Sequence, residues 1–268
     1  MGTTPERRAM RCDAVTLDPT TYERKHGAEE CHCSELLPER TWRDMLGIVE
    51  DGGIPVVRLR LASLSADGDQ RGLEFEVLDA VQNGRQFVAF SHVWANGRGN
   101  LEGNGLSHCQ WLQLQRYAQG CRVDTDPPSH GKLAGIMPFW FDIFCARRGP
   151  GDDDHMYRLR TKAILRMSEI YQTAAVALIA DSGLEPISRE PSLQEFGMRL
   201  TLSSWLRRPW TMHEGAVAEN VKVKTTAGMV DLQGLSKRFN DLITLAKSPA
   251  PRNAEMRQGK DMSLAPWV

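Results

Sequence analysis

The sequence predicts an α/β fold with a mostly parallel sheet flanked by helices, preceded by a small α+β lead-in. Two observations support this prediction. From residue 87 to about residue 220, short apolar runs of strand length alternate with stretches of helical spacing. The apolar runs also carry a polar residue near the point where each buried strand should end. Alternation of this kind favours parallel strands that are joined by right-handed helical crossovers.

The lead-in contains one predicted helix and one predicted hairpin. Residues 41–49 have apolar positions at helical spacing, and Thr41 is available as the N-cap. The runs 54–59 and 73–77 predict the two strands of the hairpin. The resulting division of the chain is a lead-in over 1–82, a main domain over 83–240 and a C-terminal tail over 241–268.

The main domain is predicted to contain three buried strands, three helices and a closing hairpin. The helix that starts at Pro209 is favoured because proline suits the first turn of a helix. The predicted strands are 87–90, 139–144 and 174–180, the predicted helices are 107–119, 158–173 and 209–219, and the hairpin strands are 221–225 and 229–232.

Polar residues at the ends of the predicted strands indicate where a site would lie. Ligands of open α/β sheets bind outside the carboxyl ends of the strands. Ser91 and His92 follow the first strand, and Asp142 lies near the end of the second. Glu214 lies in the first turns of the helix from Pro209, which can reach the same crevice. We therefore expect the functional site at this edge of the sheet.

The composition argues against several classes of partner. The chain has 33 basic and 34 acidic residues, so no overall field favours nucleic acid or an anionic membrane. No segment approaches the roughly 18–20 continuous apolar residues of a membrane-spanning helix. The polar start of the chain lacks the apolar region of a secretory signal. We expect a cytoplasmic protein with reduced cysteines.

A group of cysteines and histidines near the N-terminus suggests a metal site. Cys12, His26, Cys31 and Cys33 offer thiolate and imidazole ligands, which suit zinc. The C-x-C spacing is less typical of zinc sites than C-x-x-C, so ordinary reduced thiols stay an alternative. The other cysteines, Cys109, Cys121 and Cys145, are scattered along the chain.

Four blocks of the sequence follow one another in a distinctive order. They read Val-Ala-Phe-Ser-His-Val-Trp at 88–94, Trp-Phe-Asp-Ile-Phe-Cys at 140–145, Ile-Tyr-Gln-Thr-Ala-Ala-Val at 170–176 and Arg-Pro-Trp-Thr-Met-His-Glu at 208–214. These blocks resemble the heterokaryon-incompatibility (HET) domain of filamentous fungi. Their order and spacing match the family over about half the chain.

The chain departs from the family pattern at three places. His213 stands where the family usually has glutamine, and Pro209 stands where an aliphatic residue is usual. Residues 146–149 also lack the usual continuation of the second block. These departures bear on activity more than on fold.

The resemblance implies a role in fungal non-self recognition and programmed cell death. HET domains are similar to Toll/interleukin-1 receptor (TIR) domains, which implies a flavodoxin-like sheet. The segment from Trp210 to Glu214 is similar to the Trp-Cys-x-x-Glu segment of TIR domains. That glutamate is catalytic in the TIR proteins that hydrolyse NAD⁺. The implied partners are a second copy of the chain or another incompatibility protein.

Glu214 is the candidate catalytic residue for cleavage of the nicotinamide–ribose bond of NAD⁺. The leaving group is already cationic, so one carboxylate that stabilises the oxocarbenium-like transition state is sufficient. The glycines at 97 and 99 allow close approach to a phosphate, although they do not follow G-x-G-x-x-G. The candidate NAD⁺-binding residues are Ser91, His92, Trp94, Asp142 and Trp210.

Each assignment has an alternative. Glu214 also suits the positive end of its helix, and Asp142 can cap a loop or pair with an arginine. Tryptophans most often pack in cores. A nucleophilic dyad of Cys145 with His92 or His213 is a further alternative. At the level of function, the alternatives are a non-catalytic, self-associating signalling module and an inactive copy, and an enzyme would need Glu214.

Overall fold

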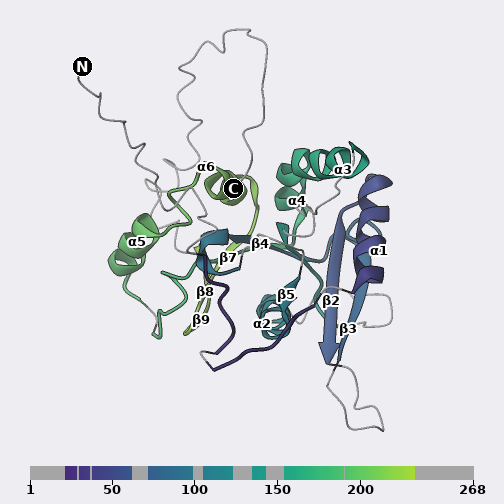
Figure 1. Ribbon diagram of the computed structural model, residues 1–268. Helices are drawn as coiled ribbons and strands as arrows, with labels where there is room; N and C mark the ends of the chain where they lie inside the picture. Colours follow the sequence, from purple (N-terminus) through teal and green to yellow (C-terminus); the bar gives the residue numbers. More distant parts are fainter. Residues whose placement is uncertain are drawn as a thin grey trace, which may run out of the picture.

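A seven-strand mixed sheet lies at the centre of the structure, a computed structural model (Figure 1). The strands are β2 (Pro55–Leu61), β3 (Leu73–Asp79), β4 (Val88–His92), β6 (Phe139–Trp140), β7 (Val176–Ala180), β8 (Val221–Thr225) and β9 (Gly228–Asp231). Their order in the sheet is β3-β2-β6-β4-β7-β8-β9. The structure describes residues 22–28, 30–36, 38–61, 72–98, 105–122, 135–142, 154–189 and 191–232.

The centre of the sheet is parallel and its edges are antiparallel. β6, β4, β7 and β8 run in one direction. The pairs β2–β3, β2–β6 and β8–β9 are antiparallel. A separate small sheet pairs β1 (Glu35–Leu36) with β5 (Leu106–Ser107). The predicted α/β class with a largely parallel sheet is therefore confirmed.

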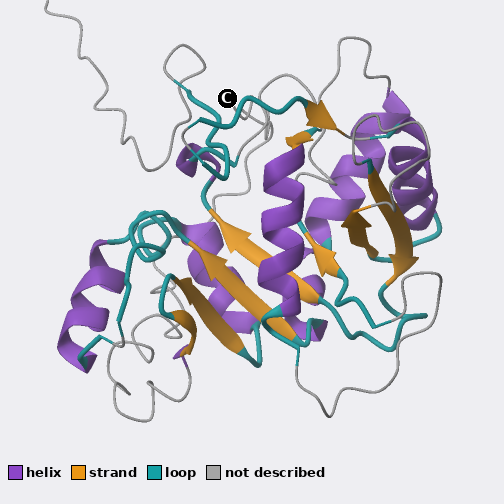
Figure 2. Cartoon of the chain, turned by 90° about the horizontal axis from the view of Figure 1, so that it is seen from below, coloured by secondary structure: helices purple, strands orange, loops and turns teal. Residues whose placement is uncertain are grey.

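Six α-helices of the described residues surround the sheet. They are α1 (Glu39–Glu50), α2 (His108–Gln119), α3 (Asp154–Leu165), α4 (Met167–Thr173), α5 (Leu193–Leu202) and α6 (Pro209–Val217), and a short 3₁₀ turn, η1, spans Trp94–Asn96. α2 lies on one face of the sheet, while α3, α4 and α6 lie on the other (Figures 1 and 2). α1 packs against the β2–β3 hairpin. In the described residues, no helix combines the length and apolar character that crossing a membrane requires.

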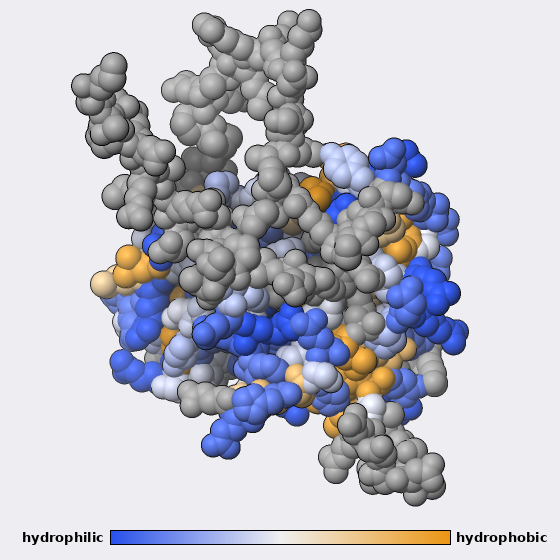
Figure 3. Space-filling model, viewed as in Figure 1, coloured by the Kyte–Doolittle hydropathy of each residue, from blue (hydrophilic) through white to orange (hydrophobic). Residues whose placement is uncertain are grey.

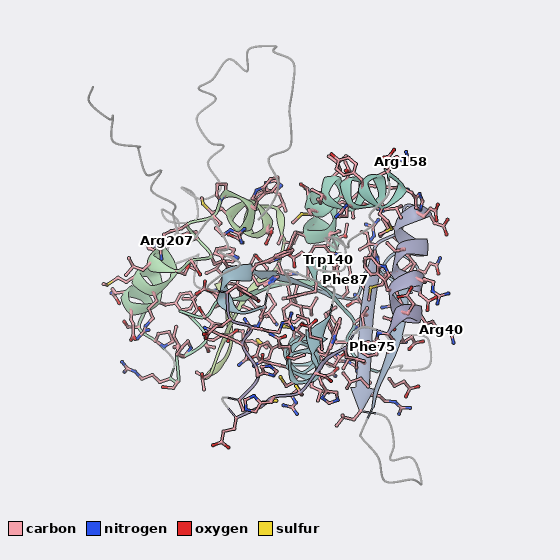
Figure 4. All side chains as sticks on the ribbon, in the orientation of Figure 1. Arg40, Phe75, Phe87, Trp140, Arg158 and Arg207 are labelled. Atoms are coloured by element: carbon pink, nitrogen blue, oxygen red, sulfur yellow. The ribbon has the colours of Figure 1, made fainter. Side chains whose placement is uncertain are left out.

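Large apolar side chains fill the space between the sheet and the helices. Phe87 and Trp140 are fully buried and lie near the middle of the sheet in Figure 4. Burying a side chain such as phenylalanine contributes about 1.5–3 kcal/mol. The labelled Arg40, Arg158 and Arg207 lie instead on the exposed outside. This segregation fixes which face of each helix meets the sheet.

Several predicted elements form at the expected positions. The buried runs at 88–92 and 176–180 form β4 and β7, which pair in parallel. Pro209 opens α6 at its first position. Ser107 caps α2 with a capping box, in which the Gln110 side chain bonds back to the cap backbone. The hairpins of the lead-in and of the C-terminal side are both present.

Three expectations need correction. Thr41 is not the cap of α1, because the helix begins at Glu39 and Thr41 is buried inside it. The helix expected over 158–173 breaks at Arg166, whose side chain bonds the carbonyls of Gly52 and Gly53. The strand expected over 139–144 ends at Trp140, while residues 143–144 lie outside the described chain.

The hairpin of the lead-in belongs to the main sheet. β2 pairs with β6 through Val57 and Phe139, so the hairpin extends the sheet instead of forming a separate unit. The first 21 residues of the lead-in and the tail over 241–268 lie outside the described residues. The domain boundaries themselves stay a prediction.

The order of the parallel strands creates a switch point between β4 and β7. From β4, the chain first adds β6 on one side and then β7 on the other. At such a point the connections leave in opposite directions, and α/β proteins commonly bind ligands outside the carboxyl ends of the two strands. The candidate functional residues lie at this end of the sheet.

Candidate active site

Polar residues meet at the carboxyl ends of β4 and β7. Ser91 and His92 are the last residues of β4, and Asp181 directly follows β7. The parallel register pairs Ser91 with Ile179 and His92 with Ala180, so the two strands end at the same level. All three polar side chains are buried. Ser91, His92 and Asp181 therefore lie together at the switch point, and Ser91 and His92 lie at the strand end where the sequence predicted them.

Glu214 reaches this edge from α6. The helix packs on β4 and α4, which turns Glu214 towards the interior, and the residue is only 6% exposed. The Ser91 hydroxyl donates a hydrogen bond of 2.5 Å to Glu214 Oε2. Two of the predicted site residues, 123 positions apart, are therefore in direct contact.

Trp205 completes this contact from the segment before α6. Its indole Nε1–H donates a hydrogen bond of 2.6 Å to Ser91 Oγ, so the hydroxyl both accepts and donates. A Cβ at Gly215 would lie 2.7 Å from the Trp205 ring, which explains why glycine follows Glu214. The ring is therefore held between β4 and α6.

Asp181 positions Trp205. The backbone N–H of Trp205 and the hydroxyl of Ser204 donate to Asp181 Oδ2 at 3.0 and 2.6 Å. A continuous chain of contacts thus runs from Asp181 through Trp205 and Ser91 to Glu214. Neither Asp181 nor Trp205 is among the site residues predicted from the sequence. The rule of strand ends would have found Asp181, whereas the role of Trp205 depends on tertiary contacts.

The environment of Glu214 favours its protonated form. Burial raises the pKa of Glu214 to about 8, and the negative charge of Asp142 acts in the same direction. Hydrogen bonds from Ser91 and Tyr171 and the charge of Arg208 lower the pKa in part. Glu214 is therefore mostly a neutral acid at pH 7, and it ionises when positive charge or higher pH favours the carboxylate.

Asp142, Trp94 and His92 form a second group beside Glu214. The Trp94 Nε1–H donates a hydrogen bond of 2.6 Å to Asp142 Oδ2. His92 Nε2 lies 3.7 Å from Asp142 Oδ1, and the imidazole stacks on Phe141 with ring centroids 4.2 Å apart. The structure therefore brings these three predicted residues together, with Trp94 bonded to the carboxylate.

His92 is neutral at physiological pH. Burial lowers the pKa of His92 well below its ordinary value, and the charges of Arg98 and Arg208 act in the same direction. Its Nε2 is a buried polar atom that has no hydrogen-bond partner among the described residues. Buried polar atoms of this kind are uncommon and often face a ligand or an ordered water.

Two other candidate residues of α6, Trp210 and His213, lie at its surface. Trp210 is 48% exposed and lies one helical turn before Glu214, on the same side of α6. His213 is exposed and shares a hydrogen bond of 2.8 Å with Ser168, which ties α6 to α4. Cys145, its predicted partner in a dyad, lies outside the described residues.

In the glycine-containing loop after β4, Gly97 packs closely against the N-terminal segment of the chain. Gly97 has a positive φ of 86°, and a Cβ there would overlap the side chain of Lys25. Its carbonyl accepts hydrogen bonds from the Lys25 N–H at 3.0 Å and from the Gln110 side chain at 2.9 Å. Gly97 therefore fastens the N-terminal segment instead of facing a phosphate, while Gly99 lies outside the described residues.

A cluster of four potential metal ligands lies where this segment meets α2. We call His26, Cys31, Cys33 and Cys109 the Cys/His cluster, because their ligand atoms lie within 4.8 Å of one another. Cys109, which seemed isolated in the sequence, takes the fourth place. Cys12, the fourth ligand expected from the sequence, lies outside the described residues. These side chains can hold a metal such as zinc.

The structure thus brings most of the predicted site residues to one edge of the sheet. Ser91 is hydrogen-bonded to Glu214, Trp94 is hydrogen-bonded to Asp142, and His92 lies beside Asp142.

The chain matches no protein-family model, and no curated protein or solved structure is significantly similar to it.

Proposed function

We propose that the chain is a HET-domain protein of fungal non-self recognition and cell death, and that it hydrolyses NAD⁺ at the nicotinamide–ribose bond. Glu214 is the catalytic residue in this proposal. The observation that carries it is the buried Glu214 carboxyl, hydrogen-bonded to Ser91 at the switch point of the parallel sheet. A buried carboxyl with a raised pKa at a strand-end crevice is typical of active sites.

The strand order supports the TIR-like, flavodoxin-like part of the proposal. Numbered by chain order, the four parallel strands β4, β6, β7 and β8 lie in the order second, first, third, fourth. Flavodoxin-like sheets have the order 2-1-3-4-5 and bind their ligand between the first and third strands. The Ser91–Glu214 contact lies at the corresponding position.

In the proposed reaction, the bond between the ribose C1′ and the nicotinamide nitrogen breaks. The bonding electron pair leaves with nicotinamide, which becomes neutral and needs no proton from an acid. The ionised Glu214 carboxylate stabilises the positive charge that develops on the ribose. Water then adds to C1′ and gives up a proton, so that the products are nicotinamide, ADP-ribose and H⁺.

The raised pKa of Glu214 fits a cationic substrate. The free site holds Glu214 mostly protonated at pH 7. A nicotinamide cation beside it favours the carboxylate, because an opposite charge at short distance lowers a carboxyl pKa. The hydroxyl of Ser91 then stabilises the carboxylate by donating to it. Substrate binding and ionisation of Glu214 are therefore coupled.

The neighbouring residues supply binding contacts in this proposal. The unpartnered Nε2 of His92, which faces Asp142, accepts a hydrogen bond from one ribose hydroxyl. Asp142 accepts a hydrogen bond from another ribose hydroxyl. Trp210, exposed one turn from Glu214, stacks on the nicotinamide or adenine ring. Because Glu214 is only 6% exposed, the proposal requires a conformational change that gives NAD⁺ access to it. Self-association of the chain is the proposed trigger for this change.

The test is NAD⁺ consumption by the purified chain, with products separated by chromatography. Glu214→Gln keeps the size of the side chain and removes its charge. Glu219→Gln is the matched control, because Glu219 is exposed just beyond the end of α6. The proposal predicts nicotinamide release by wild type and by the control, and none by Glu214→Gln. Resolved ADP-ribose and cyclic ADP-ribose distinguish hydrolysis from cyclisation.

A non-catalytic, self-associating module is the second candidate, and the exposed face of α5 favours it. Met198 and Leu202 lie one turn apart and are 65% and 69% exposed, and Figure 3 shows apolar surface where α5 lies. In this case a second copy of the chain covers α5. Met198→Lys with Leu202→Lys would then abolish the oligomer measured by light scattering, and the folded wild type would leave NAD⁺ intact.

A further inference from the structure

The Cys/His cluster joins two parts of the chain that are far apart in the sequence. His26, Cys31 and Cys33 come from the N-terminal segment, whereas Cys109 lies in the first turn of α2. The contacts to Cys109 span 83 residues from His26 and 76 residues from Cys33. We propose that the cluster is a structural zinc site, with these four residues as its ligands, that fastens the N-terminal segment to α2. This inference does not depend on the proposed function.

The distances within the cluster fit one tetrahedral zinc ion. With Zn–S bonds of about 2.3 Å and Zn–N bonds of about 2.05 Å, a tetrahedron has edges of about 3.8 Å between sulfurs and about 3.6 Å between sulfur and nitrogen. The sulfurs of Cys31 and Cys33 are 3.5 Å apart. His26 Nδ1 lies 3.6 Å from Cys33 Sγ and 3.5 Å from Cys109 Sγ. The side chains are thus spaced for a shared metal.

The chemistry of the ligands selects zinc among the common metals. Three thiols and one imidazole form a Cys₃His set, which is a closed set of structural zinc sites. The four cluster ligands include no carboxylate, whereas calcium and magnesium require oxygen ligands. All three cysteines are free thiols, so none is withdrawn from the site by a disulfide.

Hydrogen bonds from the backbone prepare the sulfurs for a metal. The Gly27 N–H donates to Cys109 Sγ at 3.2 Å, and the Cys109 N–H donates to Cys33 Sγ at 3.3 Å. Donors of this kind stabilise thiolates and fix the orientation of metal ligands. Cys109 also lies at the N-terminal end of α2, where the helix favours negative charge. These hydrogen bonds therefore hold the sulfurs of Cys33 and Cys109 in place.

Zinc would add to the contacts that tie the N-terminal segment to α2 and to the turn at Gly97. The two-residue strand β1 of this segment pairs with β5, which directly precedes α2. The Gln110 side chain donates to the carbonyls of Lys25 and Gly97 at 2.7 and 2.9 Å. A metal that links residues about 80 positions apart restricts the unfolded chain as a long-loop cross-link does. Zinc therefore stabilises the fold and braces the turn at Gly97, which follows Trp94 of the candidate site.

The test is the metal content of the full chain, purified without chelators and measured by mass spectrometry. The proposal predicts one zinc per chain in wild type, and at least a tenfold loss of bound zinc in Cys109→Ser and in His26→Ala. His32→Ala is the matched control for His26, because His32 is exposed between Cys31 and Cys33 and outside the cluster. Cys12→Ser tests the ligand set that the sequence suggested. Both of these variants should keep one zinc.

Two further measurements keep the proposal testable if a variant does not fold. Cobalt added to metal-free wild type should give the absorption of a tetrahedral thiolate site, and chelation should lower the melting temperature of wild type. Zinc lost from Cys12→Ser and kept by Cys109→Ser would overturn the ligand assignment. Wild type that holds no zinc, or that holds iron in its place, would overturn the proposal as a whole.

Discussion

The Ser91 hydroxyl donates a hydrogen bond of 2.5 Å to Glu214, and this contact joins the end of β4 to α6. It places a buried carboxyl at the point where the parallel strand order switches direction. The same hydroxyl accepts from the Trp205 indole at 2.6 Å. A single serine therefore organises two larger side chains, and most of our predictions depend on this arrangement.

Ser91→Ala should destabilise the fold by about 1–3 kcal/mol, because it leaves the Trp205 N–H and the Glu214 carboxyl without their buried partner. Denaturant unfolding at pH 7 measures this loss. Ser168→Ala is the control, since the hydrogen bond of Ser168 to His213 is exposed. Equal, small effects of the two substitutions would show that the Ser91 contact is not formed.

Glu214→Gln should stabilise the protein increasingly as the pH rises. The pKa of Glu214 is raised in the folded state to about 8, so between its unfolded value and pH 8 the unfolded state releases a proton that the folded state keeps. The contribution of this group to wild-type stability is therefore lost as the pH rises, at about 1.4 kcal/mol per pH unit. Glutamine does not titrate and avoids the loss.

Thermal unfolding from pH 5 to pH 9 tests this prediction for Glu214→Gln. The expected gain in the free energy of unfolding is a few kcal/mol at pH 8 and much smaller at pH 5, which lies close to the unfolded pKa of the carboxyl. Glu219→Gln should follow the wild-type curve, because Glu219 is exposed. A variant that is less stable than wild type at pH 8 would mean that the folded state prefers the charged carboxylate.

The proposed NAD⁺ hydrolysis should have its own pH dependence. kcat/KM should rise with pH through about 8, since it reports ionisation of Glu214 in the free enzyme. kcat should rise at lower pH, because the nicotinamide cation favours the carboxylate in the complex. Initial rates of nicotinamide release from pH 5.5 to 9.5 measure both profiles. A kcat/KM that falls through this range would contradict the carboxylate mechanism.

Gly215→Ala should displace Trp205 and destabilise the fold by about 1–3 kcal/mol, because the new Cβ would lie 2.7 Å from its ring. Gly47→Ala in α1 is the matched control, since nothing lies within 4 Å of a Cβ there. That control should instead stabilise the protein by about 1 kcal/mol, because alanine favours helix. Denaturant midpoints and Trp fluorescence of the two variants provide the measurement.

Local patterns were sufficient to predict two of the central strands, β4 and β7, and two of the helices that bear on the site. The continuous apolar runs form β4 and β7 because both faces of these strands are covered. Pro209 marked the start of α6, and Ser107 the start of α2. The strand-end rule then placed Ser91 and His92 correctly without any knowledge of the tertiary structure.

Features that depend on distant partners were not predictable in the same way. The helix over 158–173 breaks at Arg166, whose guanidinium bonds carbonyls more than 110 residues earlier. Cys109 lies in the Cys/His cluster because the pairing of β1 with β5 brings the start of α2 to the N-terminal segment. α5 was missed because it leaves large apolar side chains exposed. The sequence does contain a signal for the start of α5, because Glu195 follows Ser192 by three residues. In the structure, Ser192 caps the helix by accepting a hydrogen bond from the Glu195 N–H.

The central claim is that Glu214 carries NAD⁺ hydrolysis, and nicotinamide release by concentrated protein tests it most directly. Wild type and Glu219→Gln should release nicotinamide, with and without a cross-linker that clusters the chains, and Glu214→Gln should release none while it stays folded. Nicotinamide release by Glu214→Gln at the wild-type rate, or none from folded and clustered wild type, would contradict the claim.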